Sequence, residues 1–250
     1  MRNMFAKTLI RGVGMKKLSA FVLAGMAGLA VQTATAAPIP NINSLQDLIN
    51  AGHTGIIIGD KQFFDFSYIG SPTSGPNPAP TATQISVAQA PGSNIGLSFS
   101  YAWQSAEGFN QDSVIRYSVH TLDSSTQMFI DGVGLNFNGT APVPGSLTNA
   151  TVTETVSNLA GTVLGQTTVF DDGPGGVKDT DNSTISVAPA SRDLVITKDI
   201  QVHSTGTANG GGVSTISVVD NTFHQVPIPE PASLGLLGLG ALGLIRRRTR

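Results

Sequence analysis

A cluster of four aspartates is the strongest candidate for metal chemistry in this sequence. Asp171 and Asp172 are separated from Asp179 and Asp181 by a segment that contains three glycines. Flexible acidic loops supply the carboxylate and carbonyl oxygens that hard cations such as calcium prefer. The spacing does not fit an EF-hand, because threonine and alanine stand where that loop needs glycine and glutamate. A solvated turn is the other interpretation, since Asp and Gly are common turn residues. We therefore expect no cofactor, and calcium binding in this loop is the alternative.

Residues for enzyme chemistry are sparse. The sequence contains no G-x-S-x-G elbow, no H-E-x-x-H motif and no P-loop. Glu107, Asp112 and Glu154 could serve as the acid and nucleophile of a glycosidase only if folding brings two of them within about 5–9 Å. Four histidines are scattered without the spacing of metal ligands: His53, His120, His203 and His224. The sequence therefore predicts a protein that is not an enzyme.

Two sets of side chains could form a binding surface. Aromatic rings stack on sugars when they line an open face, and otherwise they fill a core. The aromatic residues in question are Tyr101, Trp103 and Tyr117. A second set, Thr151, Thr153 and Thr155, forms a ridge on one expected strand. An ice-binding face needs a flat array of threonines on many strands, and this sequence indicates one such strand.

The elements that must position these residues are nearly all strands. Short runs rich in β-branched and aromatic residues recur between Gly, Pro, Asn and Asp, which is typical of an antiparallel sandwich. The expected strands span residues 55–59, 62–68, 84–88, 95–103, 113–121, 127–133, 151–156, 162–170, 183–187, 194–203 and 213–219. The predicted fold class is all-β, with one antiparallel β-sandwich or jelly-roll-like domain.

Local patterns add detail to this prediction. Residues 44–50 offer an N-cap serine and a short amphipathic helix that Gly52 would end. In the run 113–120, apolar residues alternate with polar ones, so Ile115, Tyr117 and Val119 should face the core.

Charge and cysteine content limit the partners and the means of stabilisation. The whole chain has a formal charge of -2, but nine of its fourteen basic residues lie near the two ends. Between residues 37 and 229, five basic residues face fifteen acidic ones, which gives a charge of -10. Such a surface repels nucleic acid and suits cations or a neutral polysaccharide better. The chain has no cysteine, so no disulfide can stabilise it.

The N-terminal segment has the order of a secretory signal peptide. Residues 1–17 are basic, residues 18–31 form an apolar run, and Ala34 and Ala36 supply the small side chains that signal peptidase accepts. Cleavage after Ala36 would make Ala37 the first residue of the mature protein.

The C-terminal segment combines three features in a fixed order. Pro229, Glu230 and Pro231 follow two residues after another proline, and prolines at this density favour an extended, accessible link. The apolar run 232–245 would reach about 21 Å as a helix, against about 30 Å of bilayer hydrocarbon. Arginines that extend toward the lipid headgroups would lengthen this anchor and leave the body outside the cell. These charges are Arg246, Arg247, Arg248 and Arg250.

This tail resembles that of PEP-CTERM proteins. The resemblance rests on Pro-Glu-Pro, the short apolar helix and the terminal arginine cluster, and it covers about a tenth of the chain. It implies recognition by an exosortase in the inner membrane and cleavage near Pro229, Glu230 and Pro231. The apolar helix would then be a transient anchor. The alternative is a plain C-terminal anchor that is never cut.

The sequence therefore predicts three parts: a signal peptide (1–36), a β-sandwich body (37–225) and a sorting tail (226–250). We expect an exported, non-catalytic component of the cell envelope or extracellular matrix, associated with exopolysaccharide or biofilm. Its partners would be signal peptidase, an exosortase, the inner membrane during processing, and exopolysaccharide. The alternatives are a carbohydrate-binding or carbohydrate-active domain and an ice-binding protein. Two methionines could start the chain: Met1 and Met15.

Overall fold

The computed structural model describes residues 37–72, 77–105, 108–122, 128–141, 148–172, 182–204 and 212–227. The chain divides into two compact units, Met1–Thr33 and Ala34–Arg250. The first unit lies outside the described residues, so the fold below is that of the second.

The described residues form twelve strands and one short helix. Their bounds are β1 (Ala37–Pro38), α1 (Leu45–Ala51), β2 (Ile56–Ile58), β3 (Lys61–Ser71), β4 (Ser86–Gln89), β5 (Gly96–Ser105), β6 (Asn110–Thr121), β7 (Met128–Thr140), β8 (Thr148–Ser157), β9 (Val163–Asp171), β10 (Asn182–Ser191), β11 (Asp193–Ser204) and β12 (Ser214–Pro227).

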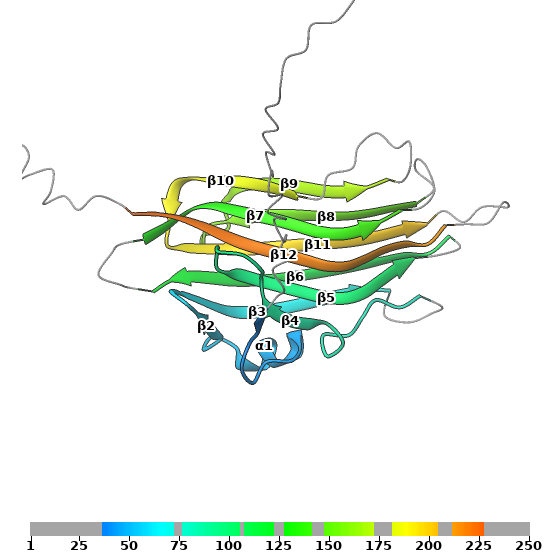
Figure 1. The fold of residues 1–250 in the computed structure, drawn as a ribbon, viewed down its shortest axis with the longest axis horizontal. Helices are drawn as coiled ribbons and strands as arrows, with labels where there is room; N and C mark the ends of the chain where they lie inside the picture. The colour runs from blue at the N-terminus through cyan, green and yellow to red at the C-terminus, as the bar shows by residue number, and fades with distance from the viewer. Residues whose placement is uncertain are drawn as a thin grey trace, which may run out of the picture. The chain divides into compact units, whose positions relative to one another are not determined.

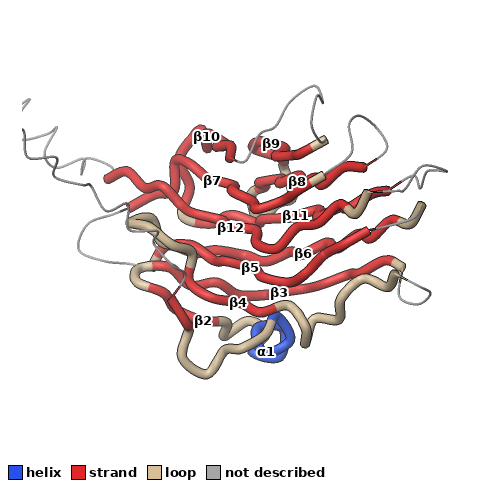
Figure 2. Tube along the Cα trace, turned by 45° about the vertical axis from the view of Figure 1, so that its right-hand side comes forward, coloured by secondary structure: helices blue, strands red, loops and turns tan. Residues whose placement is uncertain are grey.

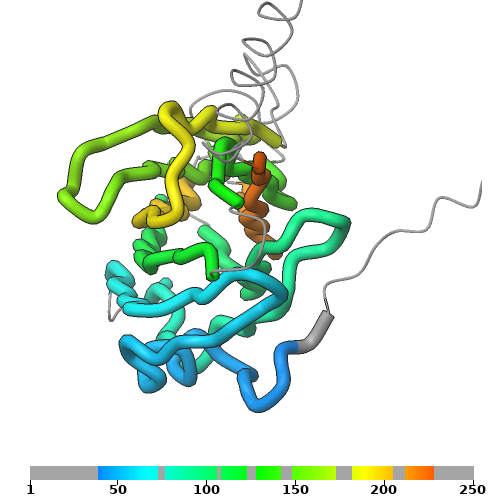
Figure 3. The backbone as a smooth tube through the Cα atoms, turned by 90° about the vertical axis from the view of Figure 1, so that its left-hand side faces the viewer, coloured from blue at the N-terminus to red at the C-terminus, as the bar shows by residue number. Residues whose placement is uncertain are grey.

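The strands form two six-stranded antiparallel sheets that pack as a sandwich (Figure 1). The first sheet has the order β1-β4-β5-β12-β7-β10, and the second has the order β2-β3-β6-β11-β8-β9. Strands at the same place in the two orders are consecutive in the chain, as in β5 with β6 and β11 with β12. From the end of the sandwich, β2 and β3 lie on one side and β9 and β10 on the other (Figure 3). The predicted antiparallel sandwich is confirmed.

The helix α1 closes one side of the body beside β3 and β4 (Figure 2). Ser44 caps it: the Ser44 hydroxyl accepts a hydrogen bond from the Asp47 backbone N–H, and the Asp47 carboxylate accepts one from the Ser44 backbone N–H. This capping box satisfies two backbone donors at the helix start. Leu45 and Leu48 are buried, and Gly52 ends the helix with a positive φ of 56°. The predicted helix and both of its ends are confirmed.

One hydrophobic core fills the space between the sheets. It follows from the alternation of the strands, which points every second side chain inward. On β6, Ile115, Tyr117 and Val119 are fully buried, as the sequence predicts. Several aromatic rings meet in this layer, and the Phe66 ring stacks on that of Tyr117 at 5.1 Å between centroids.

The structure adds one strand to the expected set and lengthens several others, for example β7, which continues to Thr140, and β10, which continues to Ser191. The added strand is β1, a two-residue strand that pairs with β4 and is too short to leave a pattern in the sequence. The structure also extends the last strand to Pro227, because Val226 pairs with Phe129 and Pro227 with Met128 on β7. The first two residues of the predicted tail therefore belong to a strand of the sandwich.

Candidate functional site

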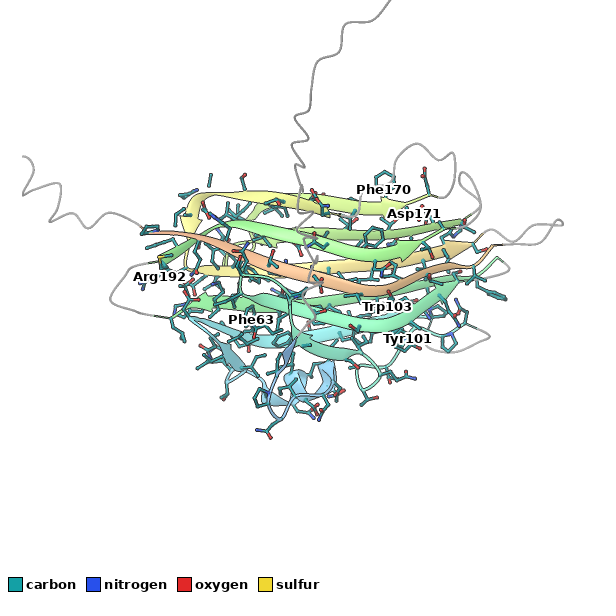
Figure 4. All side chains as sticks on the ribbon, viewed as in Figure 1. Phe63, Tyr101, Trp103, Phe170, Asp171 and Arg192 are labelled. Atoms are coloured by element: carbon teal, nitrogen blue, oxygen red, sulfur yellow. The ribbon has the colours of Figure 1, made fainter. Side chains whose placement is uncertain are left out.

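The three aromatic side chains that could have formed a sugar platform pack toward the core. Trp103 and Tyr117 are fully buried, and Tyr101 is half-buried with its ring 5.6 Å from that of Trp103 (Figure 4). The Trp103 indole Nε1 donates to the Ser113 hydroxyl at 3.1 Å. Of the two interpretations of these aromatic residues, the core position is therefore confirmed for Trp103 and Tyr117, because the alternation of β5 and β6 turns their rings inward.

The outer face of the second sheet carries a group of polar residues that pair across neighbouring strands. We call this surface the polar face. It comprises Ser67, Ile69, Asp112, Val114, Arg116, Thr151, Thr153, Thr155, Gln166, Thr168, Thr197, Asp199 and Gln201. Their neighbours along each strand point into the core, so the strands themselves hold this face in place.

Threonines spread over three adjacent strands of the polar face, where the sequence indicated one. Thr155 on β8 lies opposite Thr197 on β11, and Thr153 lies opposite Thr168 on β9. The hydroxyls of Thr153 and Thr168 are 3.1 Å apart. The threonine rows continue into the charged residues Asp112, Asp199 and Arg116, which set the polar face apart from a uniform threonine array.

A pocket of about 330 Å³ opens at one end of the polar face. Residues of three strands line it: Asn110, Gln111 and Asp112 of β6, Asn149 of β8, and Gln201, Val202 and His203 of β11. Gln201 Nε2 donates to both carboxylate oxygens of Asp199 at 3.1 and 3.0 Å, and the ring nitrogen Nδ1 of His203 meets Asn110 Oδ1. The pocket thus offers amide and carboxylate groups to a polar ligand.

Asp112 is the acidic residue among those that line this pocket, and its pKa is raised. Desolvation and the neighbouring carboxylate of Asp199 raise the pKa of Asp112 to about 6. Its Oδ1 atom is buried and accepts no hydrogen bond from the described residues. Two neighbouring carboxylates favour a state in which one of them holds a proton, because two negative charges at this site would repel each other.

This pair predicts a stability that falls as pH rises. The folded protein holds the proton of Asp112 up to about pH 6, whereas the unfolded chain loses it near pH 3.8. The free energy of unfolding should therefore decrease between those values, by about 1 kcal/mol after allowance for solvent screening. Asp199→Asn should remove the part of this decrease that comes from Asp199 and leave the part that comes from desolvation, which urea denaturation at pH 4.5 and 7.5 would measure. Equal decreases in wild type and variant would contradict the coupling.

Glu154 lies on the opposite face of the same sheet from Asp112. The alternation of β8 and β6 turns Glu154 into the core, where it is fully buried, and Asp112 outward. These two carboxylates therefore do not form a glycosidase pair across one cleft. Glu107 lies outside the described residues.

A second polar cluster, which the sequence analysis missed, lies inside the core. Lys198 Nζ donates to Glu154 Oε2, Asn221 Nδ2 donates to Glu154 Oε1 at 3.3 Å, and the Tyr117 hydroxyl donates to Asn221 Oδ1. All four residues are fully buried, and together they connect both sheets. Only their inward place in otherwise apolar alternating strands could have signalled them.

The histidines pair with acceptors on neighbouring elements. His120 Nδ1 is 2.7 Å from Asp193 Oδ1, His224 Nδ1 is 2.6 Å from Asp131 Oδ1, and the exposed His53 contacts Asp65. Within the described ranges, no group of three or more His, Cys, Asp or Glu side chains could hold a metal ion.

The acidic loop is only partly described. Asp171 ends β9, where Figure 4 shows it beside Phe170, and its Oδ2 accepts from the Ala141 backbone N–H at 3.1 Å. Asp172 is half-buried, and Asp179 and Asp181 lie outside the described residues. Calcium binding in this loop stays a prediction.

The last strand, β12, ends where a match to a known sorting motif begins. A model of the PEP-CTERM protein-sorting motif matches residues 227–249, beginning at the residue where β12 ends. This chain carries a PEP-CTERM sorting motif. The motif implies export, processing by an exosortase at the membrane, and a final place at the cell surface or outside the cell.

Comparison of the PEP-CTERM chain with curated proteins found no match. Among solved structures, it is similar to TmCBM61 in complex with beta-1,4-galactotriose, with 9% identity and a TM-score of 0.31 over 76% of this chain and 100% of that one. It is also similar to the enzymatically active domain of bacteriophage CBA120 tailspike protein 4, with 13% identity and a TM-score of 0.25 over 73% of this chain and 22% of that one. TM-scores this low carry no argument about the PEP-CTERM chain.

Most residues of the predicted processing sites lie outside the described part of the PEP-CTERM chain. These are Ala34 and Ala36 at the leader, Pro229, Glu230 and Pro231 at the sorting motif, and Arg246, Arg247, Arg248 and Arg250 at the end. Ala37, the predicted first mature residue, begins β1. No helix in the described ranges is long and apolar enough to span a membrane, and the apolar run 232–245 falls beyond them.

Proposed function

We propose that this protein is a non-catalytic component of the cell envelope or extracellular matrix that an exosortase sorts through its C-terminal tail. The observation that carries the proposal is the PEP-CTERM motif at residues 227–249, directly after the last strand of the sandwich. In this proposal the sorting tail directs export, and the β-sandwich is the part that makes contacts outside the cell.

The position of β12 favours processing close to a folded domain. This strand lies inside the first sheet, with β5 on one side and β7 on the other. Its backbone pairing continues to Pro227, two residues before Pro229. Cleavage near the Pro-Glu-Pro motif would therefore leave the sandwich intact with a very short extension.

The polar face supports a role among exopolysaccharides. Its hydroxyl, amide and carboxylate groups are ones that can exchange hydrogen bonds with sugar hydroxyls, directly or through water. The acidic charge of the body disfavours polyanions, so a neutral polysaccharide is the partner that we propose.

A carbohydrate-binding or carbohydrate-active domain is the second candidate. The aromatic platform no longer supports it, because Trp103 and Tyr117 are buried. The pocket of about 330 Å³ on the polar face favours it instead, since this volume suits a small ligand. The threonine rows leave ice binding as a minor alternative that Arg116 and Asp199 disfavour.

Replacing Pro229, Glu230 and Pro231 with alanines should block maturation. An enzyme reads the chemistry of a sorting motif, whereas a plain anchor depends on apolar length and positive charge, which this change leaves intact. The measurement is fractionation with intact-mass analysis in a strain that has the exosortase. Wild type should lose the peptide beyond the motif, and the variant should keep it.

The matched control replaces Ser217 with alanine, because this exposed residue of β12 lies before residues 227–249, which match the sorting motif. That variant should be processed as wild type. Wild-type protein that still ends at Arg250 and stays in the inner membrane would overturn the sorting proposal.

A further inference from the structure

Three buried side chains from three strands meet at one point between the sheets. Lys198 comes from β11 and Glu154 from β8 in the second sheet, and Asn221 comes from β12 in the first. The Glu154 carboxylate accepts from the Lys198 amine through Oε2 and from the Asn221 amide through Oε1. One carboxylate thus contacts both a primary amine and a primary amide.

The amide of Asn221 is held on both sides. Its Nδ2 also donates to the Gly134 carbonyl at 3.0 Å, and its Oδ1 accepts from the Tyr117 hydroxyl. A donor aimed at a carbonyl oxygen stabilises the negative charge that develops there when a nucleophile attacks the carbon. Tyr117 therefore occupies the position of an oxyanion donor.

Burial favours the neutral forms of the two ionisable partners. Desolvation lowers the pKa of Lys198 and raises the pKa of Glu154, since the core disfavours charge. A proton that moves from the amine to the carboxylate leaves a neutral amine, which is the nucleophilic form of lysine. Fixed neighbours in a water-excluded core also give such a reaction a high effective concentration.

We propose that Lys198 and Asn221 form an intramolecular amide cross-link between the two sheets. The Lys198 Nζ attacks the Asn221 side-chain carbon Cγ, the Nζ–Cγ bond forms, and the Cγ–Nδ2 bond breaks. Glu154 takes a proton from Nζ and gives a proton to the departing Nδ2, so ammonia leaves and Glu154 returns to its starting state. No oxidation or co-reactant is involved.

This cross-link would give a cysteine-free exported protein the covalent connection that a disulfide gives to others. It would join β11 to β12 across the layers of the sandwich, and a cross-link restricts the unfolded chain. The inference goes beyond the proposed sorting function and does not depend on it.

Mass spectrometry of the purified mature protein tests the proposal. The wild type should be about 17 Da lighter than its sequence between the observed termini, which is the mass of the ammonia released in this acyl transfer. Trypsin should fail to cut after Lys198, because the modified side chain carries no free amine. Lys198→Met and Asn221→Ala should both show the full mass of their sequences.

Lys61→Met is the matched control, since Lys61 is also buried and pairs with Asp60 at 2.9 Å. Asp60 accepts from the Gln225 amide as well, but its side chain is 29% exposed, so this cluster lacks the water-excluded setting of the core. This variant should keep the mass deficit. Because variants of the buried cluster could fail to fold, the wild type by itself decides the question. Wild-type protein with its full sequence mass and normal cleavage after Lys198 would overturn the cross-link.

Discussion

Replacing Trp103 with alanine should lower the free energy of unfolding by about 3–5 kcal/mol, the range for deletion of a large buried aromatic side chain. The indole is fully buried, and its Nε1 donates to Ser113. The loss combines the transfer of the ring to water with the cavity that remains in a packed core. For a body of this size it corresponds to a melting temperature lower by about 10 °C. Urea denaturation followed by circular dichroism would measure it.

Phe109→Ala provides the comparison for this prediction, because Phe109 is 40% exposed and leaves no cavity in the core. That variant should lose less than about 1 kcal/mol. Trp103 is also the single tryptophan, so wild-type fluorescence should show the emission of a buried indole. Similar losses in the two variants would show that Trp103 is not in the core.

Lys198→Met should have an effect of comparable size through a different mechanism. The substitution removes the donor to Glu154 Oε2 and leaves the fully buried Glu154 carboxyl group without that partner. Removal of one partner from a buried ion pair costs about 3–5 kcal/mol, because the remaining charge stays desolvated. If the lysine is joined to Asn221, the substitution also removes the cross-link, and the unfolded chain is then less restricted. Thermal and urea denaturation would measure it.

The same substitution at Lys61 is the control for solvent access. Lys61 is 1% exposed, but the side chain of its partner Asp60 is 29% exposed and also accepts from Gln225. Water can therefore solvate the carboxylate that Lys61→Met leaves behind, and we expect a loss of about 1 kcal/mol. Equal losses of unfolding free energy in Lys61→Met and Lys198→Met would contradict the argument that exclusion of water makes the core cluster more sensitive.

The strands of this protein could be predicted because their pattern is local. Alternation on β6 identified Ile115, Tyr117 and Val119 as core residues, and all eleven expected strands occur among the described residues. The helix was equally predictable, since Ser44 and Gly52 carry its capping chemistry in the sequence itself. Strand alternation and helix capping depend only on residues that are close in the sequence, so both can be predicted without the fold.

The polar groups were harder to interpret, because their roles depend on which strands become neighbours. Glu154 appeared as a carboxylate that could face a cleft, and the structure turns it inward to Lys198. Desolvation raises the pKa of Asp112, and Asp199 raises it further. Asp199 lies 87 positions later in the sequence but on the adjacent strand. The alternation of residues along one strand does not indicate which residues of another strand will lie beside it.

The amino-acid sequence by itself determined the export and sorting assignment, because enzymes read those signals from a linear order of residues. The PEP-CTERM motif at residues 227–249 is such a signal. It also determined the all-β class, since side-chain alternation is a property of each strand alone. Only the tertiary structure decided which polar residues meet. Strand order placed Lys198, Glu154 and Asn221 together between the sheets, and burial there gives these ordinary side chains the environment for new chemistry.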